Sequence, residues 1–163
     1  GFWRAASQMG LVEPSGAPVR FVRLWQPCDL VERWAARIEA ARGGAQGLAC
    51  VDVGCGSGRD AAFLAERGWH VVALDNLSKA LHRCGALASQ HRLSHRVSLL
   101  HCDVRRSPVP LRAPRGGGFD LVLVSRFIHR PLFPQLRRWV RKGGFLVYSH
   151  FLDDAEEGRG AEE

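Results

Sequence analysis

Residues 51–60 read Val51-Asp52-Val53-Gly54-Cys55-Gly56-Ser57-Gly58-Arg59-Asp60. A short stretch with strand character runs into three alternating glycines, and a segment compatible with a helix follows at once. Glycine at every second position allows a sharp turn after a strand and lets the backbone approach a ligand with no Cβ in the way. The N–H groups at the start of the following helix point toward the same place. The stretch therefore predicts a ligand-binding turn between a buried strand and a helix.

The spacing of these glycines separates two kinds of nucleotide site. A dinucleotide fingerprint requires G-x-G-x-x-G, but here the third glycine comes one residue early and Arg59 stands where that motif needs glycine. A second strand-like stretch, residues 70–74, ends in Asp75. A carboxylate at the tip of the second strand can accept both ribose hydroxyls. Strand, glycine turn, helix, strand and terminal Asp, in this order, predict a Rossmann-like unit that binds a nucleoside.

The rest of the chain alternates between strand and helix patterns. We expect helices at residues 30–42, 59–67, 78–91 and 132–140, and strands at 48–53, 70–74, 97–101, 119–124 and 145–148, the last after a turn at Gly143-Gly144. Alternation at this spacing predicts an α/β fold, a doubly wound and mostly parallel sheet with right-handed crossovers.

The 163 residues fit one domain in three parts. Residues 1–47 form an N-terminal segment and helix that cover the pocket, and residues 48–152 form the ligand-binding core. Residues 153–163 hold six acidic residues and one arginine, and they predict an acidic, disordered tail.

Composition restricts the cellular setting. No apolar run approaches the roughly 20 residues of a membrane span, so no membrane partner is expected. Five cysteines without a C-x-x-C pair argue against a disulfide framework and against a metal site. Reduced thiols favour the cytoplasm. A targeting segment upstream of Gly1, directing the protein to an organelle, stays open.

The charge balance leaves two interpretations. The chain carries 23 Lys+Arg against 16 Asp+Glu, a formal net charge of +7, and a basic body attracts nucleic acid such as RNA. The only lysines are Lys79 and Lys142, so the arginine excess is equally consistent with a compositional bias.

Four strings together carry a family resemblance: Asp52-Val53-Gly54-Cys55-Gly56-Ser57-Gly58-Arg59, Phe63-Leu64-Ala65, Gly68-Trp69 and Val72-Ala73-Leu74-Asp75. They resemble the class I S-adenosylmethionine-dependent methyltransferases, and most closely the small-molecule methyltransferases of the tellurite-resistance type. The resemblance covers about residues 48–151.

The resemblance implies S-adenosyl-L-methionine as cofactor and S-adenosyl-L-homocysteine as product. In that family the glycine turn wraps the methionine portion of the cofactor, and the acidic residue after the second strand holds its ribose. The acidic residue after the third strand accepts a hydrogen bond from the adenine amino group. The predicted cofactor-binding residues are Asp52, Gly54, Cys55, Gly56, Gly58, Asp75, Asn76, Asp103, Val104 and Ser125.

Each of the three acids also has a structural alternative. Asp52 would cap the glycine turn, Asp75 would be an ordinary strand-end acid, and Asp103 would be a turn residue. Cys55 is expected to line the pocket through its backbone and not to act as a nucleophile, because no base is recognisably paired with it.

The segment after the fourth strand lies where open α/β sheets place substrates. Arg126, His129 and Arg130 are the candidates there for orienting the acceptor or moving a proton. The alternative for His129 and Arg130 is a histidine at a helix start and a surface arginine. No Asn/Asp-Pro-Pro-Tyr/Phe/Trp string follows this strand, which disfavours methylation of base amino groups.

One departure from the family pattern affects the expected function. A complete class I fold has seven strands, and the last two are not recognisable here, which would leave an exposed sheet edge for a dimer or another partner. Three functions follow as hypotheses. The first is methyl transfer to a small molecule, the second is methyl transfer to RNA or protein, and the third is an inactive cofactor-binding domain that serves interactions.

Overall fold

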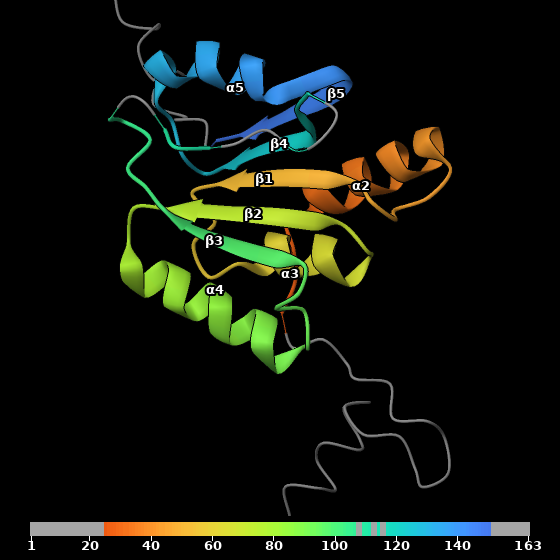
Figure 1. Ribbon diagram of the computed structural model, residues 1–163, viewed down its shortest axis with the longest axis horizontal. Helices are drawn as coiled ribbons and strands as arrows, with labels where there is room; N and C mark the ends of the chain where they lie inside the picture. The colour runs from red at the N-terminus through yellow and green to blue at the C-terminus, as the bar shows by residue number, and fades with distance from the viewer. Residues whose placement is uncertain (1–24, 107–108, 112–113, 115–116, 151–163) are drawn as a thin grey trace, which may run out of the picture.

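The computed structural model describes residues 25–150 except 107–108, 112–113 and 115–116 (Figure 1). The predicted acidic tail and residues 1–24 of the predicted N-terminal segment lie outside the described residues.

A single sheet of five parallel strands forms the centre of the molecule. Its order is β3-β2-β1-β4-β5, and its strands are β1 (Ala49–Val53), β2 (His70–Asp75), β3 (Val97–His101), β4 (Phe119–Ser125) and β5 (Val140–Ser149). Parallel neighbours require crossover helices, and the helical patterns between the strands supply them. The predicted doubly wound α/β fold is confirmed, and all pairs in the sheet are parallel.

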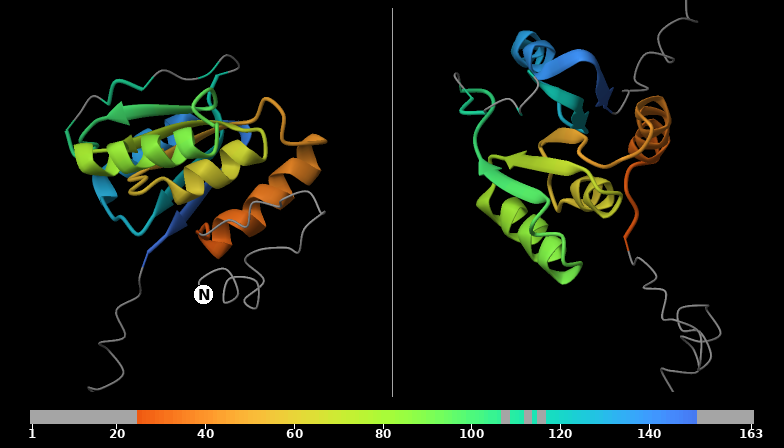
Figure 2. Two further views of the ribbon diagram at one scale, coloured as in Figure 1. Left: turned by 90° about the horizontal axis from the view of Figure 1, so that it is seen from below. Right: turned by 45° about the vertical axis from the view of Figure 1, so that its right-hand side comes forward.

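Helices cover both faces of the sheet (Figure 2). The helices are α2 (Asp29–Arg42), α3 (Arg59–Glu66), α4 (Ser78–Gln90), the 3-10 turn η1 (Arg130–Leu132) and α5 (Phe133–Trp139). Successive strand residues point to opposite faces, so Cys50 packs in the cluster beneath α2, α3 and α4, whereas Val51 packs in the cluster beneath η1 and α5.

The predicted turn at Gly143-Gly144 is wrong, because β5 already begins at Val140. The pairing runs from Phe119 with Val140 directly to Leu121 with Phe145, so the glycines lie in a bulge of the strand. A Cβ on Gly144 would lie 2.7 Å from the Phe119 carbonyl oxygen, and this close backbone approach explains why glycine is needed. The predicted helix 132–140 also begins earlier, as η1, with a proline in the first positions of both η1 and α5.

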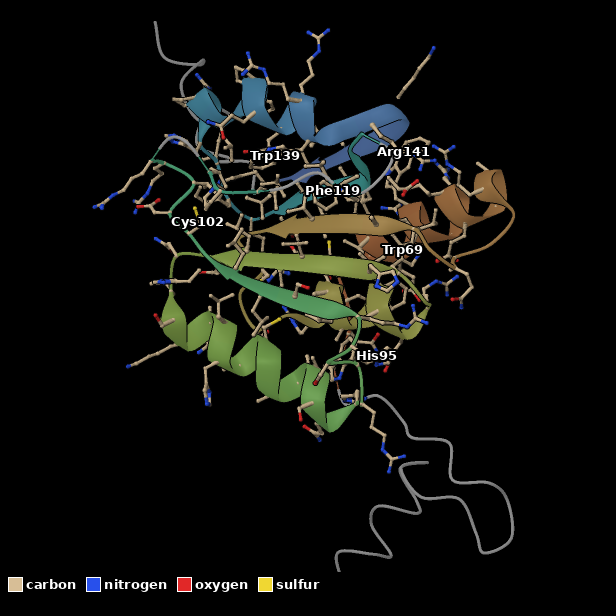
Figure 3. All side chains as sticks on the ribbon, in the orientation of Figure 1. Trp69, His95, Cys102, Phe119, Trp139 and Arg141 are labelled. Atoms are coloured by element: carbon tan, nitrogen blue, oxygen red, sulfur yellow. The ribbon has the colours of Figure 1, made fainter. Side chains whose placement is uncertain are left out.

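A buried carboxylate with two partly exposed arginine partners holds the amino-terminal end of the sheet. Asp120, which is 2% exposed, accepts the Ala49 N–H at 3.0 Å and lies 3.1 Å from Arg141 Nε and 3.8 Å from Arg42 Nε. It therefore joins β4 to β1, β5 and α2. Figure 3 shows Arg141 and Trp69 at this end and Cys102 at the opposite, carboxyl-terminal end of the strands.

A second buried carboxylate, Glu39 on α2, binds the α3–β2 connection. The Trp69 indole N–H donates to it at 2.7 Å, and Arg67 donates from Nε at 2.8 Å and again from its terminal nitrogen. Burial would raise the pKa of Glu39, but these hydrogen bonds and the arginine charge hold it below its ordinary value.

Candidate functional site

The glycine turn after β1 folds back over the end of β2. Gly54, Gly56 and Gly58 have φ values of +76°, +56° and +79°, a left-handed region that only glycine adopts without cost. The N–H groups of Gly54 and Cys55 both donate to the Leu74 carbonyl, at 2.8 and 3.0 Å. Nothing lies within 4 Å of a Cβ built on Gly56. The turn is therefore a rigid cradle that is open on one side.

A cavity of about 620 Å³ lies over this cradle at the carboxyl ends of the strands. Its volume is in the range of small-molecule sites. The predicted cofactor-binding residues that line it are Gly54, Cys55, Gly56, Asp75, Asn76, Asp103, Val104 and Ser125.

Asp52 and Gly58, by contrast, lie beneath the turn. Asp52 is 2% exposed, and its Oδ2 has no hydrogen-bond partner among the described residues. Burial raises the pKa of Asp52 well above its ordinary value, and the carboxylates of Asp60 and Asp75 add to this effect. A Cβ on Gly58 would lie 2.8 Å from Cys84 Cβ and still closer to its sulfur, so Gly58 allows α3 and α4 to pack closely.

Asp75 connects the tip of β2 to the turn. Its Oδ2 accepts the Gly56 N–H and its Oδ1 accepts the Leu77 N–H, each at 2.9 Å. A carboxylate oxygen has two lone pairs, so each oxygen keeps one for a hydroxyl in the cavity. These two acceptor oxygens fit the two hydroxyls of a ribose.

The carboxylate of Asp103 is paired with Arg105, two residues further along the chain. Arg105 donates to its two carboxylate oxygens, from Nε and from a terminal nitrogen, both at 2.8 Å. These hydrogen bonds lower the pKa of Asp103 to about 2. The carboxylate is therefore ionised at every physiological pH and can accept a hydrogen bond from an amino group.

The cavity also includes residues that the sequence did not single out as site residues. Gln26, Pro27, Cys28, Asp60 and Phe127 line it. The Cys28 N–H donates to Asp60 Oδ1 at 2.7 Å. Burial raises the pKa of Asp60, against the lowering by this hydrogen bond and by two arginine charges. The one sequence signal for Asp60 is its place next to the glycine motif, and residues 26–28 belong to the N-terminal segment that is expected to cover the pocket, although no motif singles them out.

Of the three residues predicted on the acceptor side, one lines the cavity and two do not. Arg126 lines the cavity and has a φ of +57°, a backbone conformation that costs a non-glycine residue energy and clusters at functional sites. His129 and Arg130 are not among the lining residues. They lie at the start of η1, as the helix-start alternative predicts.

Cys55 lines the cavity as a neutral thiol. A hydrogen bond with Cys84 raises its pKa, and burial adds to the effect. A neutral thiol is a poor nucleophile, so the role of Cys55 is confined to the shape and backbone of the turn.

The sheet order, the left-handed glycine turn and the carboxylate at the tip of β2 define a class I methyltransferase domain. The sequence agrees with this geometry. The chain belongs to the methyltransferase domain family, whose sequence model matches residues 50–144. The expected cofactor, S-adenosyl-L-methionine, is thereby confirmed, and the open cradle and Asp75 fit it.

Individual proteins are similar to this chain in sequence or in fold. The uncharacterized protein UNK4.09 of Schizosaccharomyces pombe is 31% identical over 136 residues, 64% of this chain and 40% of that protein. A Methanococcus maripaludis protein assigned to the S-adenosyl-L-methionine-dependent methyltransferases aligns with a TM-score of 0.58 at 21% identity, covering 72% of this chain and 54% of the other.

A third similar protein is a methyltransferase from Geobacter sulfurreducens, solved with S-adenosyl-L-homocysteine. It aligns with a TM-score of 0.57 at 17% identity, and the alignment covers 74% of this chain and 47% of the Geobacter sulfurreducens chain. The chain thus spans 40% of the curated relative and about half of these structures. Among the described helices, none is long and apolar enough to cross a bilayer.

Proposed function

We propose that this chain transfers a methyl group from S-adenosyl-L-methionine to a small-molecule acceptor. The observation that carries the proposal is the division of the cavity. Asp75 and Asp103 follow β2 and β3, on one side of β1 in the sheet, and suit the nucleoside, whereas Phe127 follows β4 on the other side and is left, with Gln26 and Asp60, for an acceptor. A cavity with an aromatic ring and polar groups that can orient a ligand is typical of a small-molecule site.

The bound cofactor would supply an activated methyl group on a sulfonium. The residues of the chain therefore need to orient the acceptor and exclude water, and no strong base is required. Residues 26–28 and Phe127 line the part left for the acceptor, and Asp60 offers a carboxylate oxygen, Oδ2, that accepts no hydrogen bond from the described residues. A finer assignment, to methyltransferases of the tellurite-resistance type, is supported by the strings around Gly54 and Asp75.

The proposed setting is the cytoplasm. All five cysteines are free thiols, and thiols persist in a reducing compartment.

The test combines binding with turnover. We expect calorimetry to show binding of S-adenosyl-L-homocysteine, and we expect labelled S-adenosyl-L-methionine to methylate members of a panel of small thiols, phenols, amines and carboxylates. Absence of binding would contradict the family-based cofactor site, whereas binding without turnover on the panel would contradict the proposed acceptor class.

RNA or protein is the second candidate acceptor, favoured by arginines around the cavity. Arg105, with a side chain 56% exposed, and Arg126 line the cavity, while Arg106 is 89% exposed beside them. Arginines at such a rim would contact phosphates. Affinity for RNA that falls steeply with salt, together with labelling of RNA, would favour this candidate over the first.

An interaction domain is the third candidate, favoured by the edge strand β5. Among the described strands, β5 pairs only with β4, and an open edge can pair with a second copy or another chain. Cofactor binding without turnover, together with a dimer in sedimentation experiments, would support it.

A further inference from the structure

One wall of the cavity comes from the chain that leaves β4, residues 125–127, which we call the β4 exit. Ser125, Arg126 and Phe127 all line the cavity. Arg126 has a φ of +57°, in the left-handed region, so the chain changes direction here at a cost in energy that the surrounding structure has to offset. The position of this wall therefore depends on what holds the β4 exit in that conformation.

Two hydrogen bonds with the end of β5 hold the β4 exit. Ser125 pairs with Ser149 in the sheet, and the Arg126 N–H donates to the Ser149 carbonyl at 2.8 Å. One residue earlier in β5, the Tyr148 hydroxyl donates to the Phe127 carbonyl, also at 2.8 Å. Figure 1 shows β5 beside β4, its neighbour in the sheet. Burial raises the pKa of Tyr148 above its ordinary value, so the phenol keeps its proton and remains a donor at neutral pH.

The side chain of Phe127 lies against the glycine turn. A Cβ built on Gly54 would lie 3.7 Å from Phe127 Cβ and 3.9 Å from its Cγ, which is ordinary van der Waals contact. There is room for little more than a methyl group between Gly54 and the Phe127 side chain. Phe127 therefore connects two elements, because β5 holds its carbonyl while its side chain borders the turn that follows β1.

Phe127 lies where the two parts of the cavity meet. Asp75 and Asp103, which suit the nucleoside, follow strands on one side of β1, and Phe127 follows β4 on the other side. The glycine turn after β1 lies between them. Phe127 would therefore border the amino-acid portion of the cofactor as well as the acceptor.

Packing also holds the two aromatic rings. Phe127 and Tyr148 both pack against the apolar cluster on this face of the sheet, and the Tyr148 ring lies 5.2 Å from the Phe133 ring of α5. Loss of the Tyr148 hydroxyl would leave both rings in the cluster and remove the hydrogen bond that sets the distance between β5 and the Phe127 backbone. We therefore expect a small displacement of the wall, with an effect on binding of the size of one hydrogen bond.

We propose that Tyr148 is a positioning residue for the cofactor site: its hydroxyl fixes Phe127 against the glycine turn, and this wall strengthens binding of the amino-acid portion of the cofactor. The proposal rests on the cofactor function assigned to this cavity. It extends that function by making affinity depend on a side chain of β5 that lies outside the cavity lining.

Calorimetry with two ligands tests the proposal. S-adenosyl-L-homocysteine carries the amino-acid portion, whereas methylthioadenosine has the same nucleoside without it. Tyr148→Phe keeps the ring and removes the hydroxyl, and we expect its affinity for S-adenosyl-L-homocysteine to fall roughly two- to tenfold, the effect of one lost hydrogen bond. Its affinity for methylthioadenosine stays at the wild-type value. Equal losses for the two ligands, or no loss for either, overturn the proposal.

A double-mutant cycle tests whether the hydroxyl acts through Phe127. Phe127→Ala removes the ring and keeps the carbonyl, so we expect it to weaken binding of S-adenosyl-L-homocysteine more than Tyr148→Phe does. Tyr148→Phe then causes little further loss in the Phe127→Ala protein, because no ring is left to position. Losses that add in the double variant mean that the hydroxyl acts elsewhere, and the proposal is wrong. Phe133→Leu is the matched control, since it changes a ring contact of Tyr148 and not its hydrogen bond, and we expect it to bind both ligands as the wild type does.

A measurement without ligand separates this proposal from the cofactor function. The amide of Arg126, which donates to Ser149, is expected to exchange with solvent faster in Tyr148→Phe than in the wild type or in Phe133→Leu. If S-adenosyl-L-homocysteine fails to bind the wild type, the cofactor function fails, while exchange of this amide still decides whether the hydroxyl holds the β4 exit. Equal exchange rates in the wild type and Tyr148→Phe overturn the proposal.

Discussion

Three predicted cofactor-binding aspartates lie in or beneath the cavity, and each has a different environment. Asp75 accepts two backbone N–H groups, Asp103 is held by an arginine, and Asp52 is buried with an oxygen lacking a partner among the described residues. Because the environments differ, we expect substitution to have a different effect at each of the three aspartates.

Replacing Asp75 with Ala removes the proposed ribose acceptor. Hydrogen bonds to a charged group contribute about 1.5 to 3 kcal/mol each, so we expect affinity for S-adenosyl-L-homocysteine to fall roughly 100-fold or more, as measured by calorimetry. Asp75→Asn, which keeps one oxygen, serves as the matched control. An Asp75→Ala protein that is folded and binds with unchanged affinity would remove the ribose assignment.

We expect Asp103 to recognise the adenine amino group by accepting a hydrogen bond from it. We expect Asp103→Asn to lose the preference for S-adenosyl-L-homocysteine over its inosine analogue, in which a keto oxygen replaces the amino group. Because the pKa of Asp103 is about 2, this preference in the wild type should stay constant between pH 8 and pH 5. A preference that survives in Asp103→Asn would favour the turn-residue alternative.

Asp52 should limit stability at neutral pH. Burial raises its folded-state pKa above the unfolded value, so the folded state binds the proton more tightly and the wild type loses stability as pH rises through the folded pKa. Asp52→Asn lacks this titration. We expect it to be more stable by about 1 to 3 kcal/mol at pH 8, with the difference shrinking toward pH 4, in urea unfolding. A difference that does not vary with pH would contradict this cause.

The glycine turn shows how one element serves both binding and packing. Gly56 faces open space, whereas Gly58 contacts Cys84. We expect Gly58→Ala to lower the free energy of unfolding by about 2 to 4 kcal/mol, from left-handed strain plus overpacking. Gly43→Ala isolates the strain, because Gly43 has a similar φ of +75° and nothing within 4 Å of its Cβ. Equal losses in the two variants would mean that the contact with Cys84 contributes nothing.

Most elements could be predicted from the sequence because local patterns and the fold agree in them. β3 was predicted with its observed bounds, and α3 and α4 to within one residue of theirs. β5 was not, because Gly143-Gly144 has the composition of a turn, and only pairing with Phe119 draws it into the strand. A long-range backbone contact of this kind leaves no local signal.

The same limit applies to the site. The residues predicted to line it follow strand ends, where the topology of a parallel sheet gathers them. Cys28 and Asp60 are 32 positions apart and meet through one hydrogen bond. His129 and Arg130 were proposed from proximity in sequence to β4, but the chain leaves the cavity after Phe127 and turns into η1.

For the molecule as a unit, ligand binding and folding are coupled. A ligand that binds only the folded state at 100 times its Kd adds about 2.7 kcal/mol of stability. For a domain of this size that corresponds to an increase in Tm of roughly 5 to 10 °C. We expect scanning calorimetry to show this shift with S-adenosyl-L-homocysteine in the wild type and not in Asp75→Ala. An equal shift in both would place the ligand elsewhere.

The ion pairs of Asp120 lie at the end of the sheet away from the cavity. They join β1, β4, β5 and α2, so damage there reaches four elements at once without touching a cavity wall. A defect at Asp120 would therefore reduce the yield of refolded protein while the molecules that do refold keep their normal affinity. Assays of crude activity would report such a variant as a poor enzyme, and only a count of active molecules would reveal a normal enzyme made in short supply.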